Sequence, residues 1–202
     1  MTQMEMIDVT YALNGRSLPA DHAYALWEEV VRVMPWLAAE AQAGILPLRA
    51  PEHGDDLLLP RRARLVLRVP VGLAPLARNL SGQALDVGGH ALVVGEARER
   101  PLQPAPTLHA QLVASASPEQ EFVLEMQKEL GALGIHGELI CGKRHTLAGS
   151  EGRIAGYSLV VHELKPQESL SLQYRGLGGE RRHGCGMFIP YKVIANLDGE
   201  GG

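Results

Sequence analysis

One order of predicted elements occurs twice along this chain. In the first half, residues 6–13 alternate apolar and polar side chains as a strand does, and Asp21 then caps a helix that ends at Pro35. Two short extended segments, a strand, a short helix and a hairpin follow, at residues 46–48, 57–59, 64–69, 73–80 and 84–94. The first half therefore reads strand, helix, strand, strand, helix, strand.

The second half repeats this order. A strand at 108–115 precedes Ser117-Pro118-Glu119-Gln120, which has the form of a capping box with proline at the first helical position. The predicted elements after that helix are strands at 138–141 and 154–164, a helix at 166–174 and a strand at 187–194. This order is that of the split βαβ unit. We therefore predict an α+β protein made of tandem ferredoxin-like (RRM-like) βαββαβ domains.

The predicted boundary between the two domains is rich in proline. Residues 101–106 contain three prolines, which make a stiff and extended connector. We therefore expect an N-terminal domain at 1–100, a C-terminal domain at 107–197 and a short tail at 198–202.

Composition argues against several classes of protein. Aromatic residues make up 4% of the chain, too few for a broad platform that stacks single-stranded bases. No apolar run reaches the roughly 18 residues that span a membrane, and residues 1–10 lack a signal-peptide pattern. Two distant cysteines fit a reducing compartment, so we predict a cytoplasmic protein.

Charge is unevenly distributed around a net value of −4. Residues 1–60 hold three Lys/Arg against nine Asp/Glu, and residues 61–140 hold eight of each. Residues 141–192 hold eight Lys/Arg against four Asp/Glu, with three histidines. This gradient favours a polyanion partner for the C-terminal third, although solvated faces also produce such gradients.

A glycine-rich basic loop is predicted at residues 176–186. Glycine lets a ligand approach the backbone closely, and the guanidinium groups of Arg181 and Arg182 suit phosphate. No Gly-Lys-Ser/Thr closes the loop, and it follows a helix and precedes a strand, so it is neither a Walker loop nor a dinucleotide fingerprint. The loop predicts a polyanion site; the alternative is a flexible hairpin with solvated arginines.

Several segments resemble one known family. They are Leu-Pro-Ala-Asp-His-Ala-Tyr-Ala-Leu at 18–26, Ile-Cys-Gly-Lys-Arg at 140–144, and the runs at 169–178 and 181–192. The chain resembles, to about Ala195, the CRISPR-associated endoribonucleases that process repeat RNA, the Cas family numbered six, and most closely the myxobacterial type I branch. The resemblance implies cofactor-free and metal-independent cleavage of precursor transcripts at the base of a repeat stem-loop. It also implies 5′-hydroxyl and 2′,3′-cyclic phosphate ends, a bound mature guide RNA, and other subunits of a type I effector complex as further partners.

His22 is the predicted proton carrier. It lies at the start of the first helix, where an anion can dock, and the resembled family commonly has its proton-transfer histidine at or near this helix. We expect His22 at the exposed mouth of the helix, and Tyr24 nearby to orient the phosphate or the 2′-hydroxyl. The alternatives are a capping histidine and a packing tyrosine. His145, expected in a turn, and His183 are the rival proton carriers.

A duplex is read mostly by its shape and phosphates, so we predict RNA contacts from basic residues and from the glycine-rich loop. These residues lie in the C-terminal half. They are Lys143, Arg144, His145, Gly178, Gly179, Arg181, Arg182, His183 and Lys192. Arg61, Arg62 and Arg64 form a second basic cluster, which either meets a single-stranded flank or is a solvated strand entry.

Other chemistries have weaker support. His183, Cys185 and the distant Cys141 lack the spacing of a zinc site, so we predict no metal and expect Cys185 to be buried. His109 and His162 lie in strand patterns and are expected on a sheet face or in the core. Two alternatives remain open: an RNA-hairpin-binding subunit without cleavage, and a small-molecule sensor, which would lack the steep salt dependence of RNA binding.

Overall fold

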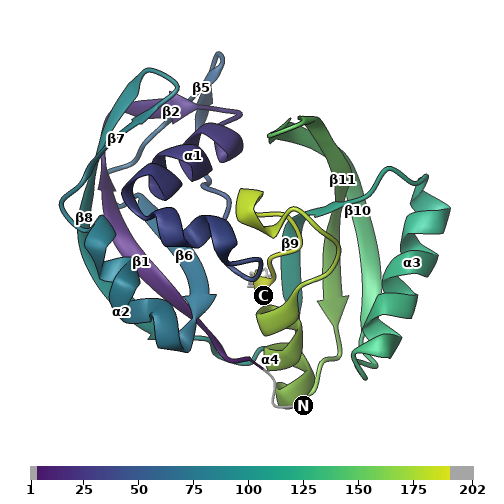
Figure 1. The fold of residues 1–202 in the computed structure, drawn as a ribbon. Helices are drawn as coiled ribbons and strands as arrows, with labels where there is room; N and C mark the ends of the chain where they lie inside the picture. The colour runs from purple at the N-terminus through teal and green to yellow at the C-terminus, as the bar shows by residue number, and fades with distance from the viewer. Residues whose placement is uncertain (1–3, 192–202) are drawn as a thin grey trace, which may run out of the picture.

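A computed structural model describes residues 4–191 and shows two α+β units side by side (Figure 1). The first unit has a five-stranded antiparallel sheet in the order β3-β6-β1-β8-β7. Its strands are β1 (Met6–Asn14), β3 (Gly44–Ile45), β6 (Arg64–Pro70), β7 (Ala84–Val87) and β8 (His90–Pro101). A small sheet joins β2 (Ser17–Pro19), β5 (Asp56–Leu58) and β4 (Glu52–His53).

The helices of the first unit close one face of its large sheet. They are α1 (Ala23–Val33), η1 (Pro35–Ala39), η2 (Val71–Leu73), α2 (Ala74–Ala77) and η3 (Arg78–Leu80). Val9 and Tyr11 alternate inward from β1 and pack in one core with Leu26 and Val30 of α1, as the sequence period requires. The helix predicted at 73–80 is one turn of α-helix between two 3₁₀ turns.

The second unit has a four-stranded antiparallel sheet in the order β10-β11-β9-β12. Its elements are β9 (Leu108–Ala114), α3 (Glu119–Ala132), β10 (Glu138–Gly149), β11 (Gly152–His162), α4 (Pro166–Arg175), η4 (Arg181–His183) and β12 (Ile189–Pro190). Phe122, Met126 and Leu130 of α3 form its core with β9 and β11.

Both sheets have the strand order of a ferredoxin-like fold. The fourth, first, third and second strands are β8-β1-β6-β3 in the first unit and β12-β9-β11-β10 in the second. The predicted tandem ferredoxin-like architecture is confirmed.

Two local predictions are wrong, and a third is tested only in part. The strand predicted at 138–141 continues to Gly149, so His145 lies in a strand opposite Gly156 and not in a turn. Pro118, and not Ser117, occupies the N-cap position of α3, without a side-chain hydrogen bond. The last strand is described only at Ile189–Pro190, and residues 192–194 of the prediction lie outside the described residues.

A buried arginine joins the two units. Arg68 on β6 has no exposed surface, and its guanidinium donates to both carboxylate oxygens of Asp8, at 2.7 and 3.0 Å. Its Nη1 also donates to the carbonyl oxygens of Phe188 (2.8 Å) and Gln173 (3.2 Å) in the second unit. A buried charge needs this complete set of partners, so the junction fixes how the units meet. Within residues 4–191, none of the helices is long and apolar enough to cross a membrane.

Candidate active site

A cleft of about 580 Å³ lies between the two units. The start of α1 and residues 47–50 line it from the first unit, and β9, β10 and β11 line it from the second. Four of the eight histidines in the chain reach its wall: His22, His109, His145 and His183. The cleft therefore gathers both rival proton carriers around the predicted one.

His22 is buried in the wall of the cleft, with 7% of its surface exposed, and not at an open helix mouth as predicted. Its Nδ1 lies 3.1 Å from the carbonyl oxygen of Pro19 and 3.2 Å from that of Ala20. Since a carbonyl oxygen only accepts, Nδ1 carries the proton, and the neutral ring has its lone pair on Nε2. Burial lowers the pKa of His22, against the opposing effect of the two carbonyls, and this favours the neutral form.

The N-terminus of α1 opens at the same wall. His22 occupies the N-cap position without a side-chain cap bond, and the first turn holds no acidic residue. Asp21 is not the cap that we predicted. Its carboxylate instead accepts from the Ala148 N–H (2.7 Å) and from Arg153 (2.6 Å), across the cleft. The helix start is thus left open to an anion while Asp21 fastens the β10–β11 hairpin to it.

Tyr24 and His183 lie together beside His22. Their rings meet edge to face with centroids 5.9 Å apart, and both His22 and His183 border a second small hollow. His183 is 2% exposed, and neither of its ring nitrogens forms a hydrogen bond with the described residues. Burial lowers the pKa of His183. The side chain of His183 is therefore buried in the wall of the cleft, and its contact with RNA stays a prediction.

The glycine-rich loop is only partly open to solvent. Arg181 is 8% exposed; its Nε donates to the carbonyl oxygen of Gln42 (2.7 Å) and its Nη2 to that of Gln173 (3.3 Å). Burial lowers its pKa to about 9. In this conformation the Arg181 side chain points into the junction of the units, and its phosphate contact stays a prediction. Gly178, Gly179 and Arg182 are exposed.

The β10–β11 hairpin carries three other predicted RNA contacts on its surface. Lys143, Arg144 and His145 are all exposed. Arg144 is held in place, because its Nη1 donates to the Tyr157 hydroxyl (2.8 Å) and its guanidinium lies 5.3 Å from the centre of that ring. Lys192 lies outside the described residues. Arg61, Arg62 and Arg64 are exposed at the start of β6.

One pair in the cleft was missed by sequence reasoning. His109 lies on β9 where a sheet-face residue was expected, and Arg49 approaches it from the first unit with its Nη2 3.2 Å from Nδ1. The two residues are 60 positions apart. The strand pattern predicted only that His109 lies on a sheet face or in the core, and no motif indicated that Arg49 would meet it.

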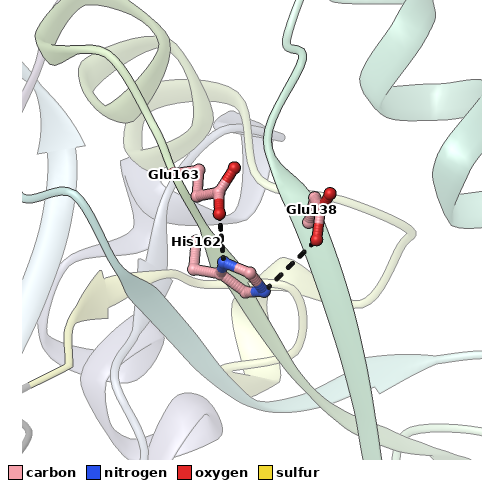
Figure 2. Close-up of side chains that lie close together, drawn as sticks. All are labelled: Glu138, His162 and Glu163. Atoms are coloured by element: carbon pink, nitrogen blue, oxygen red, sulfur yellow. Dashed lines mark ion pairs between the residues drawn. The ribbon is translucent and has the colours of Figure 1, made fainter.

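A second cluster of titratable side chains lies outside the cleft (Figure 2). His162 stands between Glu138, 4.0 Å from its Nε2, and Glu163, 3.9 Å from its Nδ1. The two ring nitrogens face different carboxylates, so the two glutamates do not converge on one ring nitrogen. Cys185 is not part of this cluster; it is a buried residue of the glycine-rich loop, and burial raises its pKa to about 12.

Comparisons with known proteins agree with one another. A family model described as Cas6 Crispr matches residues 7–193. The CRISPR-associated endonuclease Cas6 of Myxococcus xanthus (strain DK1622) is 31% identical over 200 residues, which cover 98% of this chain and 87% of that protein. Two solved structures, a CRISPR-associated protein Cas6 and an RAMP protein binding different RNA substrates, superpose with TM-scores of 0.68 and 0.64. In both comparisons, 93% of this chain aligns with the whole of the solved chain, at 11% and 12% sequence identity. The similarity to these structures is therefore one of fold.

Proposed function

This chain belongs to the Cas6 family of CRISPR-associated proteins, and we propose that it is a metal-independent endoribonuclease that cuts CRISPR precursor transcripts at the base of the repeat stem-loop. The observation that carries the proposal is the state of His22. Its Nε2 lone pair stands in the wall of a cleft, beside a helix N-terminus without a side-chain cap. The named activity of the Myxococcus relative and the RNA-binding description of one structural neighbour agree with this proposal.

The reaction uses the nucleophile that RNA already carries. The 2′-hydroxyl oxygen attacks the adjacent phosphorus while the bond to the 5′-oxygen breaks, which leaves a 2′,3′-cyclic phosphate and a 5′-hydroxyl. Nε2 of His22 takes the proton of the 2′-hydroxyl, and water supplies the proton of the 5′-oxygen. The amide groups at the start of α1 hold the phosphate, and Tyr24 orients it.

The exposed surface of the second unit suits a stem-loop. Lys143 and Arg144 on the hairpin and Arg182 on the loop are exposed cations, and Gly178 and Gly179 are exposed glycines of the loop. Such contacts to phosphates hold a duplex without reading its sequence. The mature guide RNA stays bound to this surface, and the protein then serves as the hairpin-binding subunit of a type I effector complex.

The test is cleavage of a labelled hairpin repeat RNA in EDTA by the wild type and by His22→Ala. Loss of the proton carrier should slow cleavage by roughly 10²–10⁴-fold and leave RNA binding intact. His53→Ala is the matched control, because His53 is exposed and does not line the cleft.

The chemical groups at the ends of the RNA product identify the cleavage reaction. A 2′,3′-cyclic phosphate in EDTA supports the proposal. Cleavage that His22→Ala retains would move the proton transfer to another histidine of the cleft, and tight binding without any cut would make the protein a structural subunit alone.

A further inference from the structure

The cleft holds two imidazoles whose tautomers are opposite. A guanidinium group only donates hydrogen bonds, so the Nδ1 of His109, 3.2 Å from Arg49 Nη2, must be the acceptor. The proton of the neutral His109 ring is therefore on Nε2. In His22 the two carbonyl partners place the proton on Nδ1 and leave the lone pair on Nε2. At Nε2, the His22 ring accepts a hydrogen bond and the His109 ring donates one.

We propose that His109 is a second catalytic residue of this cleft, which donates its Nε2–H to a non-bridging oxygen of the scissile phosphate, and that Arg49 is the positioning residue that keeps the proton on Nε2. This proposal rests on the proposed function and adds a group that the reaction needs. Charge accumulates on the non-bridging oxygens as the phosphorane forms, and a fixed donor aimed at them stabilises the transition state more than the ground state.

The surroundings of His109 fix its ring. It lies on β9 in register with Val160 of β11 and Ile189 of β12, and its ring packs against Tyr191 at 5.6 Å. His109 belongs to the second unit and Arg49 to the first, so the pair forms only when the two units meet around the cleft. Burial and the Arg49 charge lower the pKa of His109, which keeps the ring a neutral donor at neutral pH.

The other two histidines of the cleft lack this arrangement. His183 is buried and forms no hydrogen bond with the described residues; the Glu180 carboxylate lies 3.7 Å from its Nε2, beyond hydrogen-bond distance. His145 is exposed on β10. Only His109 combines a half-buried position in the wall with a charged partner that dictates which ring nitrogen donates.

The donation involves no proton transfer, so the balance of the reaction is unchanged. The proton of the 2′-hydroxyl still goes to His22, the bond between phosphorus and the 5′-oxygen still breaks, and His109 ends the step with its proton on Nε2. A neutral imidazole that polarises an oxygen in this way is known from other enzymes.

Single-turnover cleavage of the hairpin repeat RNA at saturating protein tests the proposal. We expect His109→Ala to slow the cut about 10²-fold, as the loss of one oxyanion donor does, without weakening the binding of a 2′-deoxy RNA that cannot be cut. His109→Gln should restore most of the rate, since its amide nitrogen takes the place of Nε2 and donates. A single phosphorothioate diastereomer at the scissile phosphate should slow the wild type but add nothing to the defect of His109→Ala.

The role of Arg49 has a readout that does not depend on cleavage. In ¹⁵N spectra of the free protein, His109 should show a protonated Nε2 and a bare Nδ1, and Arg49→Ala should give a mixture of tautomers. If Arg49 is only a phosphate contact, Arg49→Ala will weaken binding and leave the tautomer unchanged, which overturns its positioning role.

The outcomes separate the two proposals. A wild type that cuts, with His22→Ala inactive and His109→Ala at the wild-type rate, overturns the role of His109 and keeps the proposed function. A wild type that binds the RNA and never cuts overturns both. If His109→Ala unfolds, the folded His109→Gln variant and the phosphorothioate measurement decide in its place. A stereospecific phosphorothioate effect supports His109 as the donor, and the absence of such an effect overturns that role.

Discussion

Two regions of this molecule combine glycine, arginine and histidine, and they use these residues in opposite ways. In the loop at 176–186, Arg181 and His183 are buried. On the β10–β11 hairpin, Lys143 and His145 are exposed, and His145 lines the cleft. The loop looks the more basic in sequence, but the hairpin presents more of its charge to solvent.

The difference comes from what each region contacts. The loop meets the first unit, where Arg181 donates to the carbonyl of Gln42 and where η4 lies against β3 and α1 (Figure 1). The hairpin projects along the cleft and touches the first unit through Asp21. A charge already satisfied by buried carbonyls is costly to withdraw, so residue type alone does not say which cation is available to a phosphate.

The largest expected effect concerns the two ends of the loop. Arg68 donates to the carbonyl of Gln173 before the loop and to that of Phe188 after it. Arg68→Met leaves Asp8 unpaired in a mostly buried position, and we expect the free energy of unfolding to fall by about 3–5 kcal/mol. Chemical denaturation measures it, with Arg64→Met on the exposed start of the same strand as the control. Equal effects of the two variants would mean that the loop is not anchored through Arg68.

A smaller effect is expected from the glycines within the loop. Gly186 has φ +64°, and a methyl group there would collide with the carbonyl oxygen of Leu177. Gly186→Ala should therefore lower the free energy of unfolding by more than the roughly 1–2 kcal/mol of the left-handed backbone alone. Gly179→Ala is the matched control, because a methyl group at that exposed position meets nothing within 4 Å. If both variants melt like the wild type, the loop is the flexible hairpin of the alternative interpretation.

The buried imidazole of the loop predicts a dependence on pH. Burial lowers the pKa of His183; Arg182 also lowers it, while Glu180 and Glu28 oppose the shift. Below about pH 6.5 the unfolded chain binds a proton that the folded one does not, so stability falls as the pH drops. Thermal melting from pH 7 to pH 5 should show a shallower fall for His183→Gln, whereas His145→Gln on the exposed strand should follow the wild type. A wild-type stability that rises toward pH 5 would contradict the burial of His183.

The fold was predictable because apolar periodicity is strong in its buried elements. Strand β10 was predicted too short because most of its residues beyond Cys141 are exposed and carry no alternation. His22 was predicted from its place at the start of the first helix, a local signal, together with the family resemblance. Its tautomer is also set locally, by the carbonyls of Pro19 and Ala20. The burial of Arg181 and the contact of Arg49 with His109, in contrast, depend on residues from distant parts of the chain, which no local pattern encodes.

The smallest expected effect tests the exposed side of the comparison. If Lys143 on the hairpin and Arg182 on the loop each contact one RNA phosphate, replacing either by alanine should weaken binding modestly and reduce the salt slope of the affinity by about 1. Lys128→Ala is the control, because Lys128 is an exposed lysine on α3, which Figure 1 shows at the outer edge of the second unit. Binding of uncleavable hairpin RNA across a salt series measures all three variants. If only Arg182→Ala changes the salt slope, the RNA contact lies on the loop. If only Lys143→Ala changes it, the contact lies on the hairpin.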